Sequence, residues 1–590
     1  MTATGSLEDI RARWRRMTER RGPSRLVPLA EAVRNHVRVG DLVYFGGSMA
    51  RPNAAMFEVA RTFWDKDPQF TIAAPALTNQ HAPLVRAGLI RRVISSIHAF
   101  TFPTPAPHPL YVEAARSGSV VFENWSLLTL TMRLEAAARG LPFIPTRSLT
   151  GSDMARDLSG HEGYSEIDDP FGDGRIGVIA PLAPDVTFIH GLAADEEGNV
   201  VVCPPFYDGK WAALAARRAI IATVEKIVPA ETVRRYSHLV QIPASAVTCV
   251  CEVPLGGHPN SVPGDLMQEV GGYPDDYGFL GELRDAGGSG EDLDKWSERW
   301  ITGCADHEAY LNRLGASRIH ELRGRARADG WQFDLKGLAD RGAKSTATRQ
   351  ERHVVLASRT LVRRLEEGDL MTMLAGLGIS SLAAWMAAIR LSEEGGHIDL
   401  MVEAGVYGYL PAPADPFLFN YRNMFSGTMM SDVATMLGVM TAGPRNAAIG
   451  VLGAAQVDRE GNLNTSRMPD LLLTGSGGAN DIASGAMEVL VTIAPSPRRL
   501  VEKVDFVTSP GRSVKTLVTP EGVFERGTDG FVLTRLMPEP GMTAQSCLEK
   551  IRQGCSWSFD IKTDLAIEGQ PDVVELALCR LLDPEGLFLG

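Results

Sequence analysis

The sequence predicts an α/β protein made of two related open α/β domains, with the functional site at the interface between them. Three observations support this fold class. Short apolar segments that end in glycine turns alternate with segments of helical spacing. The chain has 590 residues, which is too long for a single hydrophobic core. A Gly-Asp-Leu segment, and later a segment that ends in Gly-Asn, occur in the same order in both halves, which indicates a duplicated domain.

The first half begins with an Arg-rich amphipathic segment, residues 7–21, which we expect to form a lead-in helix and not a secretory signal. Residues 40–47 then predict a strand that runs into a turn at Gly46 and Gly47, and residues 53–64 predict a helix. The remaining expected elements are strands at 92–97, 119–122, 175–180, 186–189, 200–202 and 246–253, and helices at 127–139 and 212–223.

Between residues 256 and 348 the composition changes, because Gly, Asp and Arg become frequent and long apolar runs are missing. This pattern predicts peripheral helices that lead into a linker between domains. We therefore expect a lead-in helix at 1–24, a first domain at 25–335, a linker at 336–349 and a second domain at 350–590.

The second half repeats the style of the first. Residues 371–374 predict a strand that leads into a turn at Gly376 and Gly378, followed by a helix at 382–391. A buried strand at 398–402 is expected to end at Glu403, with Gly405 just behind it. Further on, a strand at 471–473 is expected to lead through the glycine loop 474–481 into a helix at 482–489, capped by Asn480 or Asp481.

Glu403 is the leading candidate for chemistry. An acid at the end of an apolar strand, beside glycines that allow close approach of a ligand, is placed to react. A carboxylate there could attack a thioester and hold the acyl group covalently. The alternative is a structural acid that caps a helix or pairs with an arginine, and the isolated segment leaves both interpretations open.

Composition excludes several other classes of function. The net charge of −12 argues against non-specific nucleic-acid binding, and no apolar run approaches the roughly 20 residues of a membrane span. Seven scattered cysteines fit free thiols in the cytoplasm. We expect no metal site, because the histidines are dispersed and the cysteines lack ligand spacing. The glycine turns match neither a dinucleotide fingerprint nor a phosphate-binding loop, and a serine nucleophile elbow is missing.

Together these motifs resemble the family I coenzyme A transferases, most closely the glutaconate CoA-transferase type, in which two related α/β subunits form the enzyme. The chain is similar to a fusion of both, α-like over residues 25–335 and β-like over residues 350–590. The resemblance rests on the following segments: Gly40-Asp41 with Gly46-Gly47, residues 87–94, Gly256-Gly-His-Pro259, Val402-Glu-Ala-Gly405, residues 452–458 with 461–465, Gly475-Ser-Gly-Gly-Ala-Asn-Asp481 and the end at 582–590.

The resemblance implies that Glu403 is the catalytic glutamate of a ping-pong CoA-transferase. Ala404 stands where the family usually has Asn or Ser, which puts the substrate preference in question. An acyl-CoA and a carboxylic acid would be the substrates, with no permanently bound cofactor, and a homo-oligomer in the cytoplasm is expected. Gly46, Gly47, Gly477 and Gly478 are the candidate backbone donors to the oxyanion. The candidates for substrate or CoA binding are Gly376, Gly378, Gly405, Gln456, Asn464, Gly475 and Asn480.

Two other functions stay open at this stage. Relatives of this fold include CoA-thioester hydrolases and ring-opening lyases whose working acid lies in the α-like part. The corresponding residues 95–102 of this chain contain no carboxylate, which argues against the lyase. A protein that binds CoA without turnover is the non-enzymatic alternative.

Overall fold

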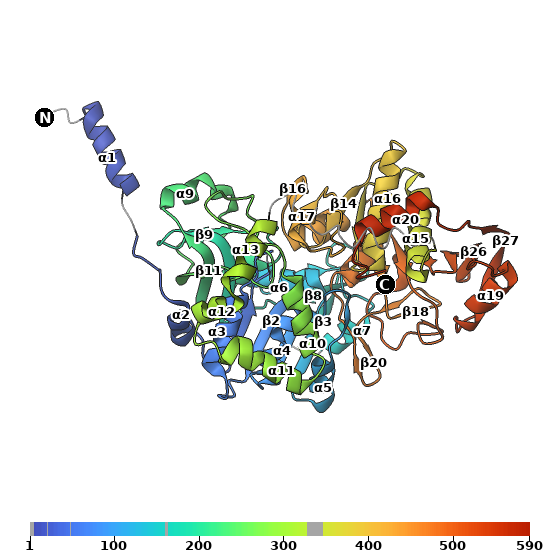
Figure 1. The fold of residues 1–590 in the computed structure, drawn as a ribbon, viewed down its shortest axis with the longest axis horizontal. Helices are drawn as coiled ribbons and strands as arrows, with labels where there is room; N and C mark the ends of the chain where they lie inside the picture. The colour runs from blue at the N-terminus through green and yellow to red at the C-terminus, as the bar shows by residue number, and fades with distance from the viewer. Residues whose placement is uncertain are drawn as a thin grey trace.

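The computed structural model describes residues 5–19, 22–47, 49–159, 163–326, 346–445 and 447–589. Figure 1 shows two α/β bodies side by side, the first half of the chain in blue to green and the second half in yellow to red. Helix α1 (Leu7–Glu19) extends away from both bodies, as expected for the lead-in segment. Most of the linker expected at 336–349 lies outside the described residues.

The first half is built on a nine-stranded sheet of order β12-β11-β9-β1-β2-β3-β4, with β10 beside β9 and β5 beside β3. Strands β11, β9, β1, β2 and β3 run parallel, so their carboxyl ends meet at one edge. The strands are β1 (Leu42–Phe45), β2 (Phe70–Leu77), β3 (Ile90–Phe100), β4 (Ala106–Pro107), β5 (Val121–Asn124), β9 (Val186–Ala194), β10 (Val200–Val202), β11 (Ala219–Ile227) and β12 (Cys249–Glu252). A separate sheet of order β6-β8-β7 joins β6 (Ile144–Thr146), β7 (Tyr164–Asp168) and β8 (Arg175–Ile179).

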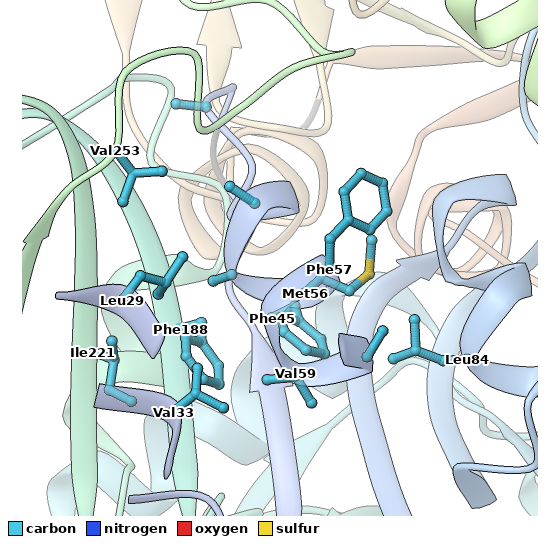
Figure 2. Packing of buried hydrophobic residues seen from close by; sticks show 14 of the residues in the cluster. Leu29, Val33, Phe45, Met56, Phe57, Val59, Leu84, Phe188, Ile221 and Val253 are labelled. Atoms are coloured by element: carbon cyan, nitrogen blue, oxygen red, sulfur yellow. The ribbon is translucent and has the colours of Figure 1, made fainter. Parts of the chain in front are cut away.

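Amphipathic helices bury their apolar faces against this sheet. Figure 2 shows Leu29 and Val33 of α2 (Leu29–His36) and Met56 of α3 (Asn53–Phe63) near Phe45 and Phe188 of the central strands. Burying such side chains contributes roughly 1.5–3 kcal/mol each. The expected peripheral helices are α10 (Tyr277–Ala286), α11 (Gly290–Ser297), α12 (His307–Leu314) and α13 (Ala316–Arg325). The others are α4 (Ala82–Arg86), α5 (Pro109–Ser117), α6 (Leu127–Arg139), α7 (Asp153–Leu158), α8 (Gly209–Leu214) and α9 (Ala230–Arg235).

The second half contains a ten-stranded sheet of order β16-β15-β14-β13-β17-β22-β24-β25-β26-β27. Its core from β14 to β24 is parallel. The strands are β13 (Thr372–Ala375), β14 (Asp399–Val402), β15 (Val406–Tyr407), β16 (Met429–Met430), β17 (Ala448–Gly453), β22 (Glu488–Thr492), β24 (Val514–Val518), β25 (Gly522–Arg526), β26 (Phe531–Leu536) and β27 (Asp560–Ile567). Two small sheets contain β18 (Gln456–Asp458), β19 (Leu463–Asn464) and β23 (Leu500–Val501), and β20 (Arg467–Met468) and β21 (Leu471–Leu472).

The helices of the second half are α15 (Arg349–Leu365), α16 (Ile379–Glu393), α17 (Tyr421–Phe425), α18 (Ala479–Gly485), α19 (Ala544–Gln553) and α20 (Val573–Leu582). Helix α15 begins with a capping box, in which the Thr348 hydroxyl accepts from the Glu351 backbone N–H and the Glu351 carboxylate accepts from the Thr348 N–H. Helices α15 and α16 pack against each other, and α20 packs against both. Of the helices that the structure describes, none is long and apolar enough to span a membrane.

The repeated Gly-Asn segments form the same turn in both halves. Asp195 Oδ1 accepts from the backbone N–H of Asn199, and the Asn199 side chain donates to Asp195 Oδ2 at 2.8 Å. In the second half Asp458 and Asn462 make the same pair of bonds, with the side chain at 3.1 Å. The glycine before each asparagine has a positive φ, 100° at Gly198 and 79° at Gly461. A shared local geometry of this detail agrees with a duplicated domain.

Some expected elements were wrong. Residues 212–223 were expected to be one helix, but α8 ends at Leu214 and β11 begins at Ala219, because the apolar residues after the turn line a buried parallel strand. Residues 471–473 form part of a short hairpin, and the helix expected at 482–489 is α18, which ends at Gly485 before β22. Asn480 and Asp481 lie inside α18, and Gly478 is its N-cap.

Candidate active site at the interface of the two halves

Glu403 follows directly after β14, at the carboxyl end of a parallel strand. Its backbone enters a tight turn in which Gly405 has a φ of 123° and lies against the carbonyl of Ser431. A Cβ on Gly405 would lie 2.2 Å from that oxygen, so only glycine fits this position. The turn therefore holds the partly buried Glu403 side chain at the edge of the sheet.

The glycine loop before α18 meets the Glu403 carboxylate. The backbone N–H of Gly478 lies close enough to this carboxylate to oppose the rise of its pKa. A Cβ on Gly478 would lie 2.0 Å from Glu403 Oε2, so the carboxylate occupies the space that a side chain would take. The Glu403 carboxylate and the backbone of Gly478 are thus in direct contact.

Two effects raise the pKa of Glu403 to about 7. Burial disfavours the charged form, and the carboxylate of Asp481 adds repulsion, while the Gly478 N–H acts in the opposite direction. Burial also raises the pKa of Asp481, to about 6. Asp481 accepts hydrogen bonds from Ser126 Oγ at 2.6 Å and from the Leu128 N–H at 3.0 Å, both at the start of α6 in the first half. The interface between the halves therefore fixes the acid that tunes Glu403.

Tyr207 brings the main chain of the first half beside Glu403. Its N–H donates to the Ala404 carbonyl at 3.2 Å, and its carbonyl accepts from the Val433 N–H at 3.1 Å. Its φ of 51° is unusual for a residue with a bulky side chain, and such backbone conformations cluster at functional sites. Burial raises the pKa of the Tyr207 hydroxyl, and the charge of nearby Glu403 adds to this rise.

Asp208 holds the turn at Gly46 and Gly47 in place. This buried carboxylate accepts from Tyr44 Oη and from the Gly47 N–H, the latter at 3.0 Å. A Cβ on Gly47 would lie 2.2 Å from Tyr207 Cδ1, so the turn packs closely against Tyr207. The Gly46 N–H donates to the Phe188 carbonyl at 2.7 Å. Both glycine N–H groups thus have acceptors, and this geometry does not support the oxyanion role expected for them.

The glycine loop 474–481, called the second glycine loop below, is paired with strand β3 of the first half. The Gly477 N–H donates to the Ser96 carbonyl at 2.9 Å, and the His98 N–H donates to the Thr474 carbonyl at 3.1 Å. Gly475 has a φ of 95° and lies directly against Ser96. Gly475 and Gly477 therefore position the loop, and Gly478 alone among the expected donors contacts Glu403.

The other expected binding residues lie in different places. Gln456 and Asn464 are buried and bond to each other at 2.8 Å within the β18–β19 pair, and Gln456 also donates to Asp505. Asn480 joins the halves, because Oδ1 accepts from the Leu149 N–H and Nδ2 donates to the Thr508 carbonyl, both at 2.8 Å. These amides are used within the protein, so none of them enters the site that we propose.

Gly376 and Gly378 do precede α16, whose N-cap is Gly378. Leu377, between them, lines a cleft at the interface, which has a volume of about 970 Å³ including its opening to solvent. The wall of the cleft also contains Ala404, beside Glu403, and Gly47 and Tyr207 from the first half. Both halves therefore contribute to one cleft next to the candidate nucleophile.

Sequence reasoning did not identify Tyr207, Asp208 or the role of Asp481. Tyr207 and Asp208 follow Pro204 and Pro205 in a loop without a recognised motif. The sequence predicted Asp481 only as a helix cap, since the folded chain alone shows Ser126 and Leu128 opposite it. Within the described ranges, no group of three or more His, Cys, Asp or Glu residues could hold a metal ion.

Comparisons with known proteins agree with this architecture. The family model described as Coenzyme A transferase matches residues 27–252 and 420–553, which is more than half of the chain. One glutaconate CoA-transferase subunit from Acidaminococcus fermentans is 28% identical over 315 residues, covering 51% of this chain and 95% of its own length. One 3-oxoadipate CoA-transferase subunit from Pseudomonas knackmussii is 28% identical over 243 residues, covering 38% of this chain and 89% of its own length.

A solved structure shows the same fold over almost the whole chain. The acyl-CoA transferase from Escherichia coli O157:H7, described as a thioester complex with CoA, has a TM-score of 0.64 and covers 95% of this chain and 98% of that chain. Its sequence identity is 16%, so this likeness concerns the fold alone. The predicted fold class and the fusion of two related halves are confirmed, and the chain belongs to the Coenzyme A transferase family.

Proposed function

We propose that this protein transfers CoA between an acyl-CoA and a carboxylic acid through a thioester formed on Glu403. The observation that carries the proposal is the contact between the Glu403 carboxylate and the Gly478 backbone N–H, beside a cleft shared by both halves. Family membership supports the general reaction. The geometry around Glu403 supports the covalent step.

In the first step, a Glu403 carboxylate oxygen attacks the thioester carbonyl carbon, and the C–S bond breaks to give a mixed anhydride and CoA thiolate. The thiolate then attacks the glutamyl carbonyl carbon, which releases the first carboxylic acid as its carboxylate and leaves a glutamyl-CoA thioester. A second carboxylate reverses these steps. Each intermediate keeps an activated acyl bond, so little free energy is lost between steps.

Each tetrahedral intermediate carries a negative oxygen. A backbone donor aimed at such an oxygen is worth roughly 3–4 kcal/mol, and Gly478 is the donor that touches the reacting side chain. The cleft between the halves would keep water from the anhydride, and the segment 407–424 could cover it, since Phe417 and Phe419 line its wall.

We also propose a cytoplasmic location and an assembly of several copies. All seven cysteines are free thiols, which persist in a reducing compartment. Exposed apolar side chains on α1, such as Trp14 at 66% exposure, would help copies to associate. Light scattering would measure the state of assembly.

Mass spectrometry of the intact protein tests the covalent step. Incubation with acetyl-CoA or butyryl-CoA is expected to add one CoA to Glu403, and borohydride reduction should convert the modified residue to an alcohol. Glu403→Gln keeps the size of the side chain but removes the nucleophile, so it should show no adduct and a drop in kcat of about 10⁴-fold or more.

The two main alternatives predict different results. A thioester hydrolase of this fold would form the adduct but release free acid without an acceptor. A lyase or a CoA-binding protein would give no adduct on Glu403, and that outcome would overturn the proposed mechanism.

A further inference from the structure

A cluster of polar groups lines the same cleft but takes no part in the proposed chemistry. It consists of Arg51, His81, Ser261 and Asp275, all from the first half of the chain. The rest of the wall is largely apolar, with Phe45, Met56, Ile97 and Phe417 among its residues. Within the described part of the chain, no hydrogen bond or ion pair joins this cluster to Glu403. It is therefore available to a different part of the substrate.

Asp275 lines the cleft and has one carboxylate oxygen without a partner in the described structure. Its Oδ1 accepts from Asn260 Nδ2 at 3.3 Å and from the Ser261 N–H at 3.2 Å. The residue is only 8% exposed. Its Oδ2 is buried and has no hydrogen-bond partner among the described residues. A buried carboxylate oxygen without a partner is unfavourable, so a ligand that donates a hydrogen bond to it would be favoured.

His81 and Ser261 present further unused groups. His81 Nδ1 accepts from the Thr78 N–H at 3.2 Å, so the neutral ring carries its proton on Nε2, and burial lowers its pKa to about 3. This Nε2 and the hydroxyl of Ser261 are buried without a partner in the described structure. Burial raises the pKa of Asp275, and the Ser261 hydroxyl lies near enough to oppose this rise but makes no hydrogen bond of normal geometry. The cluster thus offers donors and an acceptor together.

The charges of the cluster balance one another. Burial raises the pKa of Asp275 and lowers that of His81, and the nearby Arg51 guanidinium acts downward on both. No described residue forms an ion pair with Arg51. Asp415, whose pKa burial raises to about 7, and the nearby Arg422 are ionisable groups of opposite type as well. A carboxylate in the ligand would be repelled by Asp275, and an ammonium group would be repelled by Arg51. A neutral group that both donates and accepts, such as a hydroxyl, suits this balance.

We propose that the acyl substrate is a hydroxylated chain, whose hydroxyl group binds between Asp275, His81, Ser261 and Arg51 while its carboxyl group reacts at Glu403. The hydroxyl would donate to Asp275 Oδ2 and accept from His81 Nε2 or Arg51. This inference rests on the proposed transferase function and adds its substrate class. Arg51, His81, Ser261 and Asp275 are then specificity-determining residues.

Acceptor acids of matched length provide the test. Butyrate, pentanoate and hexanoate would each be compared with the acid that carries a terminal hydroxyl and with the dicarboxylic acid of the same number of carbons. At one length at least, kcat/KM for the hydroxy acid is expected to exceed both others by about tenfold or more, because a polar site left unpaired rejects the unsubstituted chain.

Two variants separate the roles of the groups. Ser261→Ala removes a hydroxyl without an internal hydrogen bond and should lower the ratio of hydroxy acid to unsubstituted acid by about threefold to tenfold. Asp275→Asn removes the charge that balances Arg51 and should raise kcat/KM for dicarboxylic acids relative to hydroxy acids. Ser117→Ala, on the exposed end of α5, is the matched control, in which both ratios should stay as in the unmodified protein.

The outcomes distinguish this inference from the function on which it rests. Exchange with all acids but no preference for a hydroxyl group at any length, or a preference for dicarboxylic acids, overturns the inference alone. Absence of exchange with every acid, together with absence of a Glu403 adduct, overturns the proposed function itself.

Discussion

As the proposed nucleophile, Glu403 combines two properties that oppose each other at neutral pH. Its pKa of about 7 makes the carboxylate more basic than that of an ordinary glutamate, and hence a better nucleophile once ionised. The same shift means that only part of the protein is ionised near pH 7. Activity should therefore depend on pH within the physiological range.

The rate of the first half-reaction is expected to rise with pH up to a midpoint near 7 and to level off above it, because only ionised Glu403 attacks. Asp481→Asn removes the charge that raises this pKa and should move the midpoint below 7. Asp369→Asn, an exposed acid of the same half, should leave it in place. Stopped-flow release of CoA measures the midpoint, and a value near 4.5 in the unmodified protein would contradict the assignment.

Stability should change with pH in the opposite direction. The folded-state pKa of Glu403 lies above its unfolded value, so its contribution is fully present below the unfolded pKa and is lost as pH rises through about 7. Glu403→Gln should thus raise the free energy of unfolding at pH 8 by on the order of 2 kcal/mol and change it little at pH 4. Denaturant unfolding at the two pH values measures the difference.

At this scale the sequence was informative where a signal is local. Glu403 could be predicted because an apolar strand, an acid and two glycines lie within one short segment. Asp208 could not, because its function depends on Tyr44 and Gly47, far away in the chain. Gln456 and Asn464 were plausible amides in a glycine-rich region, but each satisfies the other.

Among the elements, the short helix α18 and its preceding loop connect the site to the first half. Gly478 is the N-cap of α18, with a φ of −84° that any residue could adopt. A side chain at this position would therefore be opposed by the Glu403 carboxylate and not by the backbone. This makes substitution at Gly478 a local test of the contact.

Gly478→Ala is expected to lower kcat by about 10²-fold or more, since its Cβ would displace Glu403 Oε2 from the Gly478 N–H. Gly281→Ala, on helix α10 with no atom within 4 Å of the added Cβ, is the control and should retain full activity. Steady-state kinetics and thermal unfolding would be measured together. A Gly478→Ala protein with unchanged kcat would show that the contact is not needed.

The elements themselves were predicted well when hydrophobic period and length agreed. The strands around β1 and β13 and the helices α3, α6 and α16 lie where the sequence placed them. The error at 212–223 arose because β11 is buried on both faces, so its continuous apolar sequence resembles that of a buried helix.

For the whole molecule, the site exists only where the halves meet. Glu403 and Gly478 belong to the second half, whereas Tyr207, Asp208 and the cleft residues around Arg51 belong to the first. Two of the similar proteins are described as single subunits, and they cover 51% and 38% of this chain. A covalent connection between the halves should therefore be dispensable.

A chain split between residues 335 and 336 is expected to assemble when both pieces are produced together, with kcat within about tenfold of the intact protein. Each piece alone should be inactive, since it lacks one wall of the cleft. Co-purification and CoA exchange would measure the outcome. Exchange by residues 336–590 alone would contradict a shared site.

The main-chain pairing across the interface restricts how substrates enter and leave. Tyr207 is bonded on both sides to the second half, and Ser96 and His98 are bonded to the second glycine loop. A hinge motion that swung one body away from the other would have to break these amide bonds together. We therefore expect substrates to enter and products to leave through the opening of the cleft. Movements of loops and side chains would control this exchange, while the two halves stay in contact.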